Sequence, residues 1–185
     1  MAAKHILLIG IQGSGKGTQA DTLIDEHKYT LIGAGDIFRW LIKSNTTYGR
    51  QMKDAIARGE LVPDSLVLDV IDKRLSIHDW DNAPVILDGF PRNESQRKWL
   101  FEEKGYKFDA VLYLHVEDEE AVVKRMLDRG RSDDNETAIR KRLSEYHNET
   151  EPTLKWYEEQ GLLRKVDAVG TIEEVAERVR KALEL

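Results

Sequence analysis

The sequence contains no cysteine, and this absence rules out several kinds of chemistry. Disulfide bonds, thiolate metal sites and nucleophilic thiol catalysis all need that residue. Long hydrophobic stretches are missing too: an apolar run such as Ile6–Ile9 is far shorter than the roughly 20 residues that cross a bilayer. The opening segment, MAAKHILLIG, has no long apolar core of the kind that a signal peptide needs. We therefore expect a cytoplasmic protein without a membrane partner.

Positively charged residues are outnumbered by negatively charged residues in this chain of 185 residues. It has 28 Lys and Arg against 34 Asp and Glu, a formal net charge of -6 at pH 7, which disfavours a nucleic-acid partner. Hydrophobic residues make up 41% of the chain, and this disfavours intrinsic disorder. The length indicates one domain, residues 1–185. An acidic protein that binds a polyanion must gather its Lys and Arg locally, so clusters of these residues are informative.

Short apolar segments alternate with amphipathic segments along the chain. The apolar segments predict strands at residues 6–10, 29–32, 84–87, 110–115 and 162–166. The amphipathic segments predict helices at 18–27, 36–44, 48–58, 93–104, 117–128, 137–160 (interrupted at Pro152) and 171–183, with another beginning at Pro63. This alternation predicts an α/β fold with a five-stranded parallel sheet between two layers of helices.

Two of the predicted strands end in motifs that can bind a ligand. Ligands of parallel sheets bind beyond the carboxyl ends of the strands. Gly10–Thr18 follows the first strand and Asp88–Arg92 follows the third. Residues 33–62 contain predicted helices but no strand, which indicates a small helical insertion.

The segment Gly10–Thr18 reads G-I-Q-G-S-G-K-G-T and lies between a strand and a helix. Its glycines allow successive backbone N–H groups to surround a polyphosphate, and the helix N-terminus adds partial positive charge. A phosphate loop has a hydroxyl directly after its Lys, whereas Gly17 follows Lys16 here. The alternative is a glycine-rich turn without a ligand, which would need neither Lys16 nor these specific positions. The predicted ATP-binding residues of the loop are Gly13, Ser14, Gly15, Lys16, Gly17 and Thr18.

This variant of the loop resembles that of the nucleoside monophosphate kinases, above all adenylate kinase. The resemblance implies a P-loop NTPase-type α/β/α fold, with residues 33–62 as the insertion that binds the nucleoside monophosphate and residues 128–134 as a very short lid. It also implies a monomer that binds ATP together with Mg²⁺. No protein side chain is expected to bind the metal directly, because phosphates and water hold it, with Asp36 and Asp88 acting through water.

The acceptor side of the resemblance rests on two strings. In Gly35-Asp36-Ile-Phe-Arg39, it implies that Arg39 holds the acceptor phosphate. In Leu87-Asp-Gly-Phe-Pro-Arg92, Arg92 can clamp the same phosphate through two hydrogen bonds. The other residues that the resemblance assigns to the acceptor are Ala34, Asp36, Glu60, Leu61, Val62, Gly89, Phe90, Pro91 and Gln96.

Two of these positions indicate different acceptor bases. Ala34 stands where adenylate kinases usually carry a Thr that contacts adenine, and UMP/CMP kinases tend to have Ala there. Gln96 stands where adenylate kinases place the Gln that reads the adenine edge, and an amide matches the donor and acceptor of that edge. We expect the pair of contacts at Gln96 to outweigh the missing hydroxyl.

Arginines are concentrated in the segment between residues 125 and 142. Phosphoryl transfer between nucleotides gathers negative charge that several Arg can neutralise. The resemblance implies that Arg125 lies near the donor base, that Arg129 meets the donor phosphates, and that Arg131 and Arg142 lie between donor and acceptor. It also assigns the backbone of Gly170 to the donor adenine. Arg140 is interpreted as a surface ion-pairing residue.

These assignments combine into one hypothesis, which is reversible phosphoryl transfer from Mg-ATP to AMP, giving two ADP. The predicted catalytic residues are Lys16, Asp88, Arg92, Arg129, Arg131 and Arg142. One alternative is the same chemistry on CMP or UMP, or on a broad set of monophosphates. A second alternative, from a different class, is a regulatory module that binds nucleotides without transferring phosphoryl groups.

Overall fold

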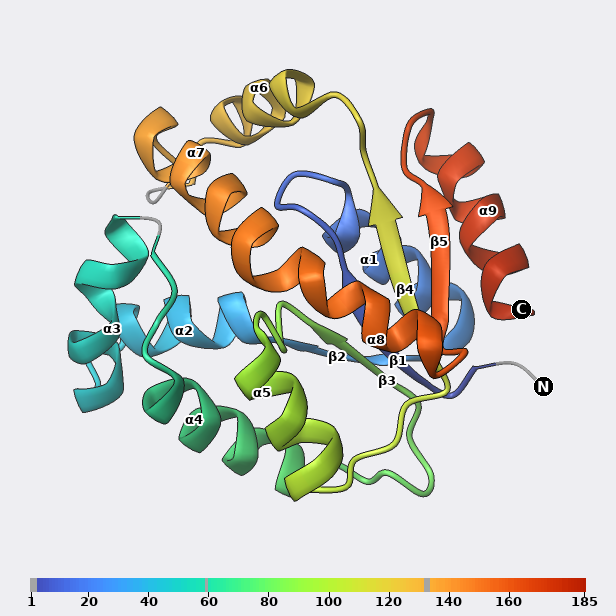
Figure 1. The fold of residues 1–185 in the computed structure, drawn as a ribbon, viewed down its shortest axis with the longest axis horizontal. Coiled ribbons are helices and arrows are strands. Elements are labelled where there is room, and N and C mark those ends of the chain that lie inside the picture. The colour runs from blue at the N-terminus through green and yellow to red at the C-terminus, as the bar shows by residue number, and fades with distance from the viewer. Residues whose placement is uncertain (1–2, 59, 132–133) are drawn as a thin grey trace.

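A computed structural model describes residues 3–58, 60–131 and 134–185. Its strands form one parallel sheet in the order β2-β3-β1-β4-β5, which confirms the five-stranded parallel sheet that the sequence predicts (Figure 1). The strands are β1 (His5–Ile9), β2 (Thr30–Gly33), β3 (Val85–Asp88), β4 (Ala110–His115) and β5 (Leu163–Asp167).

Helices connect the strands and cover both faces of the sheet, so the three-layer α/β/α prediction is confirmed as well. Helix α1 passes behind the strands and packs against α9, which stands beside β5, whereas α8 lies in front of the strands (Figure 1). The helices are α1 (Lys16–His27), α2 (Ala34–Lys43), α3 (Thr47–Ala57), α4 (Asp64–Ser76), α5 (Glu94–Lys98), α6 (Glu119–Arg129), α7 (Glu136–Glu145), α8 (Leu154–Glu159) and α9 (Ile172–Leu183). The described residues also form the π-helical turns η1 (Trp99–Glu103) and η2 (Tyr146–Thr150) and the 3₁₀ turn η3 (Glu151–Thr153).

Side-chain caps explain where several helices begin. Asn93, Asp118 and Asn135 each accept a hydrogen bond from a backbone N–H in the first turn of α5, α6 and α7. At α9, Thr171 and Glu174 form the reciprocal capping box that the sequence predicts. These caps fix the helix starts near the carboxyl edge of the sheet, where the cleft lies.

The long helical stretch predicted over residues 137–160 is divided in the structure. Helix α7 passes into η2 and then η3 before α8 begins. Pro152 lies in η3, and its ring has no N–H for the helical hydrogen bond to the preceding turn. The backbone there therefore adopts π and 3₁₀ turns, a local irregularity that the predicted break at Pro152 anticipates.

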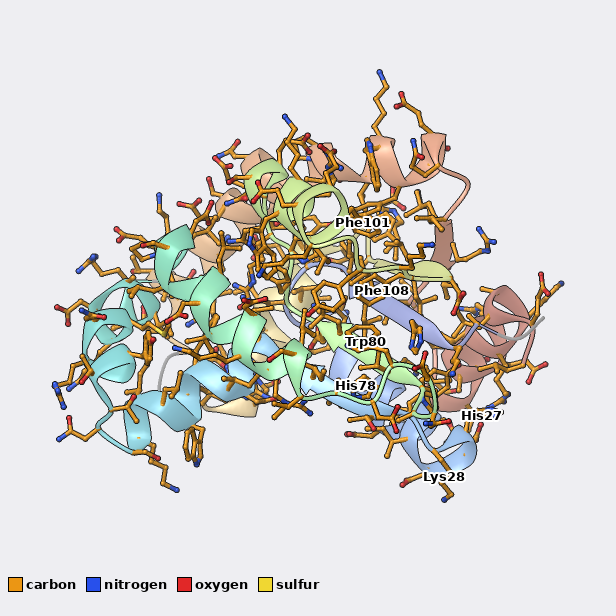
Figure 2. All side chains as sticks on the ribbon, turned by 90° about the horizontal axis from the view of Figure 1, so that it is seen from below. His27, Lys28, His78, Trp80, Phe101 and Phe108 are labelled. Atoms are coloured by element: carbon orange, nitrogen blue, oxygen red, sulfur yellow. The ribbon has the colours of Figure 1, made fainter. Side chains whose placement is uncertain are left out.

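The hydrophobic core includes the centre of the sheet and a group of aromatic rings at the amino ends of the strands. Ile6, Leu7 and Leu112 are buried because helices cover both faces of the sheet. At the amino ends, Trp80 contacts Phe108 with ring centroids 5.8 Å apart, and Phe101 lies beyond Phe108 in the same column (Figure 2). This aromatic cluster lies at the end of the sheet opposite to the motifs at the carboxyl ends of the strands. No helix in the described parts of the chain is long and apolar enough to cross a membrane.

Candidate active site

A cleft of about 590 Å³ opens at the carboxyl ends of the strands. Its walls come from the glycine loop, the start of α2, the segment after β3, the ends of α6 and α7, and the loop before α9. All the site residues predicted from the sequence line this cleft except Ala34. Ala34 is fully buried in the first turn of α2. Two motifs that are far apart in the chain therefore meet here because β1 and β3 are neighbours in the sheet.

The glycine loop forms the floor of the cleft and leads into α1. Gly13 and Gly15 have positive φ angles of 85° and 94°, a backbone conformation that other residues rarely adopt. A Cβ on Gly13 would also come within 2.8 Å of Val122 Cγ1, so that position has no room for a side chain. Lys16 Nζ donates hydrogen bonds to the carbonyl oxygens of Gly10, at 2.7 Å, and Ile11, at 2.9 Å. The ammonium group is thereby held over the loop.

Asp88 ends β3 and lies opposite Leu8 of β1, directly before the glycine loop. Its Oδ1 atom is buried and has no hydrogen-bond partner within the described residues, and the same holds for Ser14 Oγ. Buried polar atoms are normally satisfied, so each exception calls for an explanation. A carboxylate oxygen left without a donor beside a phosphate loop fits a site for metal-bound water, and the residues present therefore fit Mg²⁺ carried by ATP.

Arg92 is positioned by its own backbone and by Gly89. Its Nε donates to the Gly89 carbonyl oxygen at 2.8 Å, and its carbonyl oxygen accepts a hydrogen bond of 2.6 Å from Thr150 Oγ1. Its backbone N–H donates to Gln96 Oε1 at 2.8 Å. These contacts fix the Arg92 backbone and Nε atom beside the cleft, which Arg92 lines. Thr150 is a contact that sequence reasoning missed, because it lies in the irregular turn η2.

The arginines at the ends of α6 and α7 converge on one carboxylate. Asp134 Oδ2 accepts two hydrogen bonds from Arg129, at 2.9 and 2.8 Å, and Oδ1 accepts one from Arg142 at 2.9 Å. The Asp134 side chain is completely buried by these partners and their surroundings. Arg142 also donates to the Ile56 carbonyl oxygen of α3 at 3.4 Å. The predicted lid, 128–134, includes Ser132 and Asp133, which lie outside the described residues.

The cations of the cleft repel one another. Burial lowers the pKa of Lys16, and the nearby Arg92 and Arg129 charges lower it further, while Asp88 raises it. Burial also lowers the pKa of Arg92 and of Arg131, with neighbouring arginines adding to the effect. A polyanionic ligand would offset the repulsion among these cations. Arg140 lies apart from this group and pairs with Glu120 and Glu136 on the surface, as predicted.

The acceptor wall joins α2 to the segments before α4 and α5. Arg39 forms an ion pair with Asp36 one turn earlier. The side chain of Gln96 is only 2% exposed, and its Nε2 donates to Asp64 Oδ1 at 2.7 Å. The contact between Asp64 and Gln96 was not predicted from the sequence, because the two residues lie far apart in the chain and nothing local indicates it.

The donor wall is formed by Arg125 and the loop before α9. Gly170 has a φ of 134°, and a Cβ there would lie 2.6 Å from Glu174 Oε2. That carboxylate accepts the Thr171 backbone N–H of the capping box, so glycine is required beside it. Gln19 reaches the first residue of α9, since its Nε2 donates to the Ile172 carbonyl oxygen at 3.2 Å. Gln19 is a further cleft residue that the sequence motif did not indicate.

Known proteins are similar in sequence to this chain. The family model described as adenylate kinase matches residues 8–162. An adenylate kinase of Thermobifida fusca is 43% identical over 186 residues, with 97% of each chain covered. An adenylate kinase of a Synechococcus strain is 41% identical, with 97% of this chain and 98% of the relative covered. An adenylate kinase of Leptospira biflexa is 40% identical, with 97% of this chain and 100% of the relative covered. The similarity thus extends over nearly the whole chain.

Proposed function

The chain belongs to the adenylate kinase family and transfers phosphoryl groups between ATP and AMP, and we propose that the residues of its cleft divide this work between two nucleotide sites. One observation carries the assignment of residues. In a protein of net charge -6, a set of cations lines a single cleft with the glycine loop at its floor: Lys16, Arg39, Arg92, Arg129, Arg131 and Arg142. Their mutual repulsion is relieved by two nucleotides that bring several phosphates together.

The donor ATP lies along the glycine loop in this proposal. Backbone N–H groups between Gly13 and Thr18 and the N-terminus of α1 bind its phosphates. Lys16 exchanges its hydrogen bonds with the Gly10 and Ile11 carbonyl oxygens for the terminal phosphates. The adenine lies by Arg125 and the backbone of Gly170, which both line the cleft.

Mg²⁺ would accompany the donor phosphates. Asp88, whose Oδ1 atom has no partner within the described residues, and Asp36, which lines the same cleft, would hold it through bound water. When bound, the ion neutralises charge on the donor phosphates. The protein contributes the orientation of that water and the positive charge around it.

The acceptor AMP lies across the cleft. Arg39 and Arg92 bind its phosphate, and Gln96 reads its base, with the segment Glu60–Val62 along the base. The γ-phosphoryl then moves in line from ATP to the AMP phosphate while Arg129, Arg131 and Arg142 stabilise the charge that redistributes. No covalent nucleophile of the protein is needed.

Closure of the cleft excludes water, which would otherwise accept the phosphoryl group. We assign this role to the short lid around residues 128–134 and to the helical insertion of residues 33–62. The hydrogen bond from Arg129 to Asp134 joins the two ends of the lid. Arg142 of α7 donates both to Asp134 and to the Ile56 carbonyl oxygen, and so connects the lid to the insertion through α7. The proposal includes a monomer working in the cytoplasm, and gel filtration with light scattering tests the monomeric state.

A coupled assay with AMP, CMP, UMP, GMP and dAMP as acceptors tests the function. We expect AMP to give the highest kcat/KM, with weaker discrimination against CMP and UMP than in relatives that carry Thr at the position of Ala34. A preference for CMP or UMP would make Ala34 the true specificity signal. Absence of transfer to any of the acceptors, with ATP still bound, would favour a regulatory nucleotide-binding module.

A further inference from the structure

The side-chain amide of Gln96 is held at both of its ends. Oε1 accepts a hydrogen bond from the Arg92 backbone N–H at 2.8 Å, and Nε2 donates to Asp64 Oδ1 at 2.7 Å. A backbone N–H can only donate, and an ionised carboxylate can only accept. Both hydrogen bonds can therefore form only when the amide oxygen faces Arg92 and the amide nitrogen faces Asp64.

Asp64 is itself fixed by a second amide. Its Oδ1 atom accepts a 3.1 Å hydrogen bond from Asn93 Nδ2, and Asn93 Oδ1 accepts the Gln96 backbone N–H at 2.8 Å as the cap of α5. The carboxylate in the first turn of α4 therefore ties that helix to the start of α5. This arrangement holds the Asp64 oxygen at the Gln96 nitrogen.

These two hydrogen bonds use one of the two N–H groups and one of the two oxygen lone pairs of the Gln96 amide. One N–H and one oxygen lone pair are left for a ligand in the cleft, which Gln96 lines. The adenine edge offers an amino donor and a ring nitrogen acceptor, which match the lone pair and the N–H. The base of IMP has the reverse pattern at the same two atoms, a carbonyl acceptor and a ring N–H donor, and it would match only the reversed amide.

We propose that Asp64 is a positioning residue that sets the acceptor specificity, because it locks the Gln96 amide in the orientation that matches AMP and rejects 6-oxopurine nucleotides such as IMP. The inference rests on the proposed function, in which Gln96 reads the acceptor base. Reversal of the amide places its oxygen against the Asp64 carboxylate and its nitrogen against the Arg92 N–H. Both hydrogen bonds are then lost, so the reversed state is a minor one.

Asp64→Asn removes one side of this lock with little change in shape. The amide that this substitution introduces can turn its nitrogen toward the oxygen of a reversed Gln96, so the reversed fraction rises. Apparent affinity scales with the fraction of the competent state, and the two nucleotides respond unequally. We expect kcat/KM for IMP to rise about tenfold, mainly through a lower KM, while the value for AMP stays within about twofold. Generalised damage to the site would instead lower both values.

The experiment compares wild type, Asp64→Asn and Asp72→Asn with AMP and IMP at saturating Mg-ATP. Asp72 is the matched control, since it lies on the same helix and pairs with Lys104, at 2.8 Å, away from the cleft. Asp72→Asn should leave the ratio of IMP to AMP unchanged, and Asp64→Glu, which keeps a carboxylate, should stay close to the wild-type ratio. Asp64→Ser, whose hydroxyl donates or accepts, replaces Asp64→Asn if that variant does not fold.

The outcomes separate the inference from the function on which it rests. A wild-type enzyme that does not favour AMP among the monophosphates contradicts the proposed reading of the base by Gln96. A wild type that favours AMP, together with an Asp64→Asn ratio within twofold of wild type, overturns only the role of Asp64. An equal change of the ratio in Asp72→Asn also overturns the proposed role of Asp64. Loss of folding in both Asp64→Asn and Asp64→Ser would show that Asp64 has a structural role, and overturns the proposal in the same way.

Discussion

Replacing Lys16 by Met should abolish phosphoryl transfer and leave the fold intact. Met keeps the length of the side chain and removes its charge. The variant loses the hydrogen bonds to the Gly10 and Ile11 carbonyl oxygens, each worth about 0.5–1.5 kcal/mol net. The variant also removes the cost of burying the Lys16 charge and the repulsion of that charge by Arg92 and Arg129, which both lower the Lys16 pKa. These opposing effects leave a change of less than about 2 kcal/mol in the free energy of unfolding.

The effect on catalysis is much larger because nothing offsets it in the transition state. Removing one preorganised group that stabilises developing charge costs about 10²–10³-fold in kcat, and the full positive charge of Lys16 places the loss near the upper end. The measurements are kcat at saturating Mg-ATP and AMP and denaturant unfolding of the same preparations. Lys155→Met is the control, since Lys155 is 82% exposed and lies on α8. A Lys16→Met enzyme that keeps more than a tenth of the wild-type kcat would refute the assigned role.

Three further predictions follow from the lid, from position 34 and from a surface histidine. Because only Gly130 separates Arg129 from Arg131, ATP hydrolysis without acceptor should exceed that of a longer-lid relative under matched conditions, and a lower rate contradicts this. Ala34→Thr should raise kcat/KM for AMP about two- to tenfold and leave CMP unchanged; an unaltered ratio shows that position 34 does not read the base. A hydrogen bond with Glu151, aided by a second carboxylate, raises the pKa of His147. His147 therefore stabilises the folded state at pH values below its unfolded pKa of about 6.5, and this contribution is lost as the pH rises through the folded pKa. His147→Gln should reduce the free energy of unfolding by up to about 1 kcal/mol at pH 6 and have less effect at pH 8.5, and equal effects at both pH values would contradict the shift.

Sequence patterns predicted most of the fold because the signals are local. A strand buried on both faces, such as residues 110–115, is apolar throughout, and the predicted bounds match β4. The capping box at Thr171 and Glu174 was likewise visible as two residues at the right spacing. The helix predicted over residues 93–104 is less regular in the structure, since α5 passes into the π turn η1 at Trp99. A change in hydrogen-bond register of this kind is set by packing, as in the T-shaped contact between Trp99 and Phe90.

The candidate site could likewise be predicted only in part from the sequence. The glycine loop and the string ending at Arg92 carry their chemistry in consecutive residues, so both could be predicted from the sequence. The partners of these residues could not. Asp134 holds Arg129 and Arg142 together, and Thr150 holds the Arg92 backbone, through contacts that depend on how α6, α7 and η2 lie.

The sequence by itself determined which groups are available: a phosphate-binding loop, a set of arginines in an acidic chain, and strands that must be covered on both faces. Tertiary structure alone decided how those groups meet. The sheet order β2-β3-β1-β4-β5 places the end of β3 beside the glycine loop, although the two motifs are distant in the chain. The packing of α4 against α5 gives Gln96 a carboxylate partner and thereby an orientation. The physical reason is that backbone propensity and hydrophobic periodicity act over a few residues, whereas strand order and side-chain hydrogen bonds are settled only when the whole core is packed.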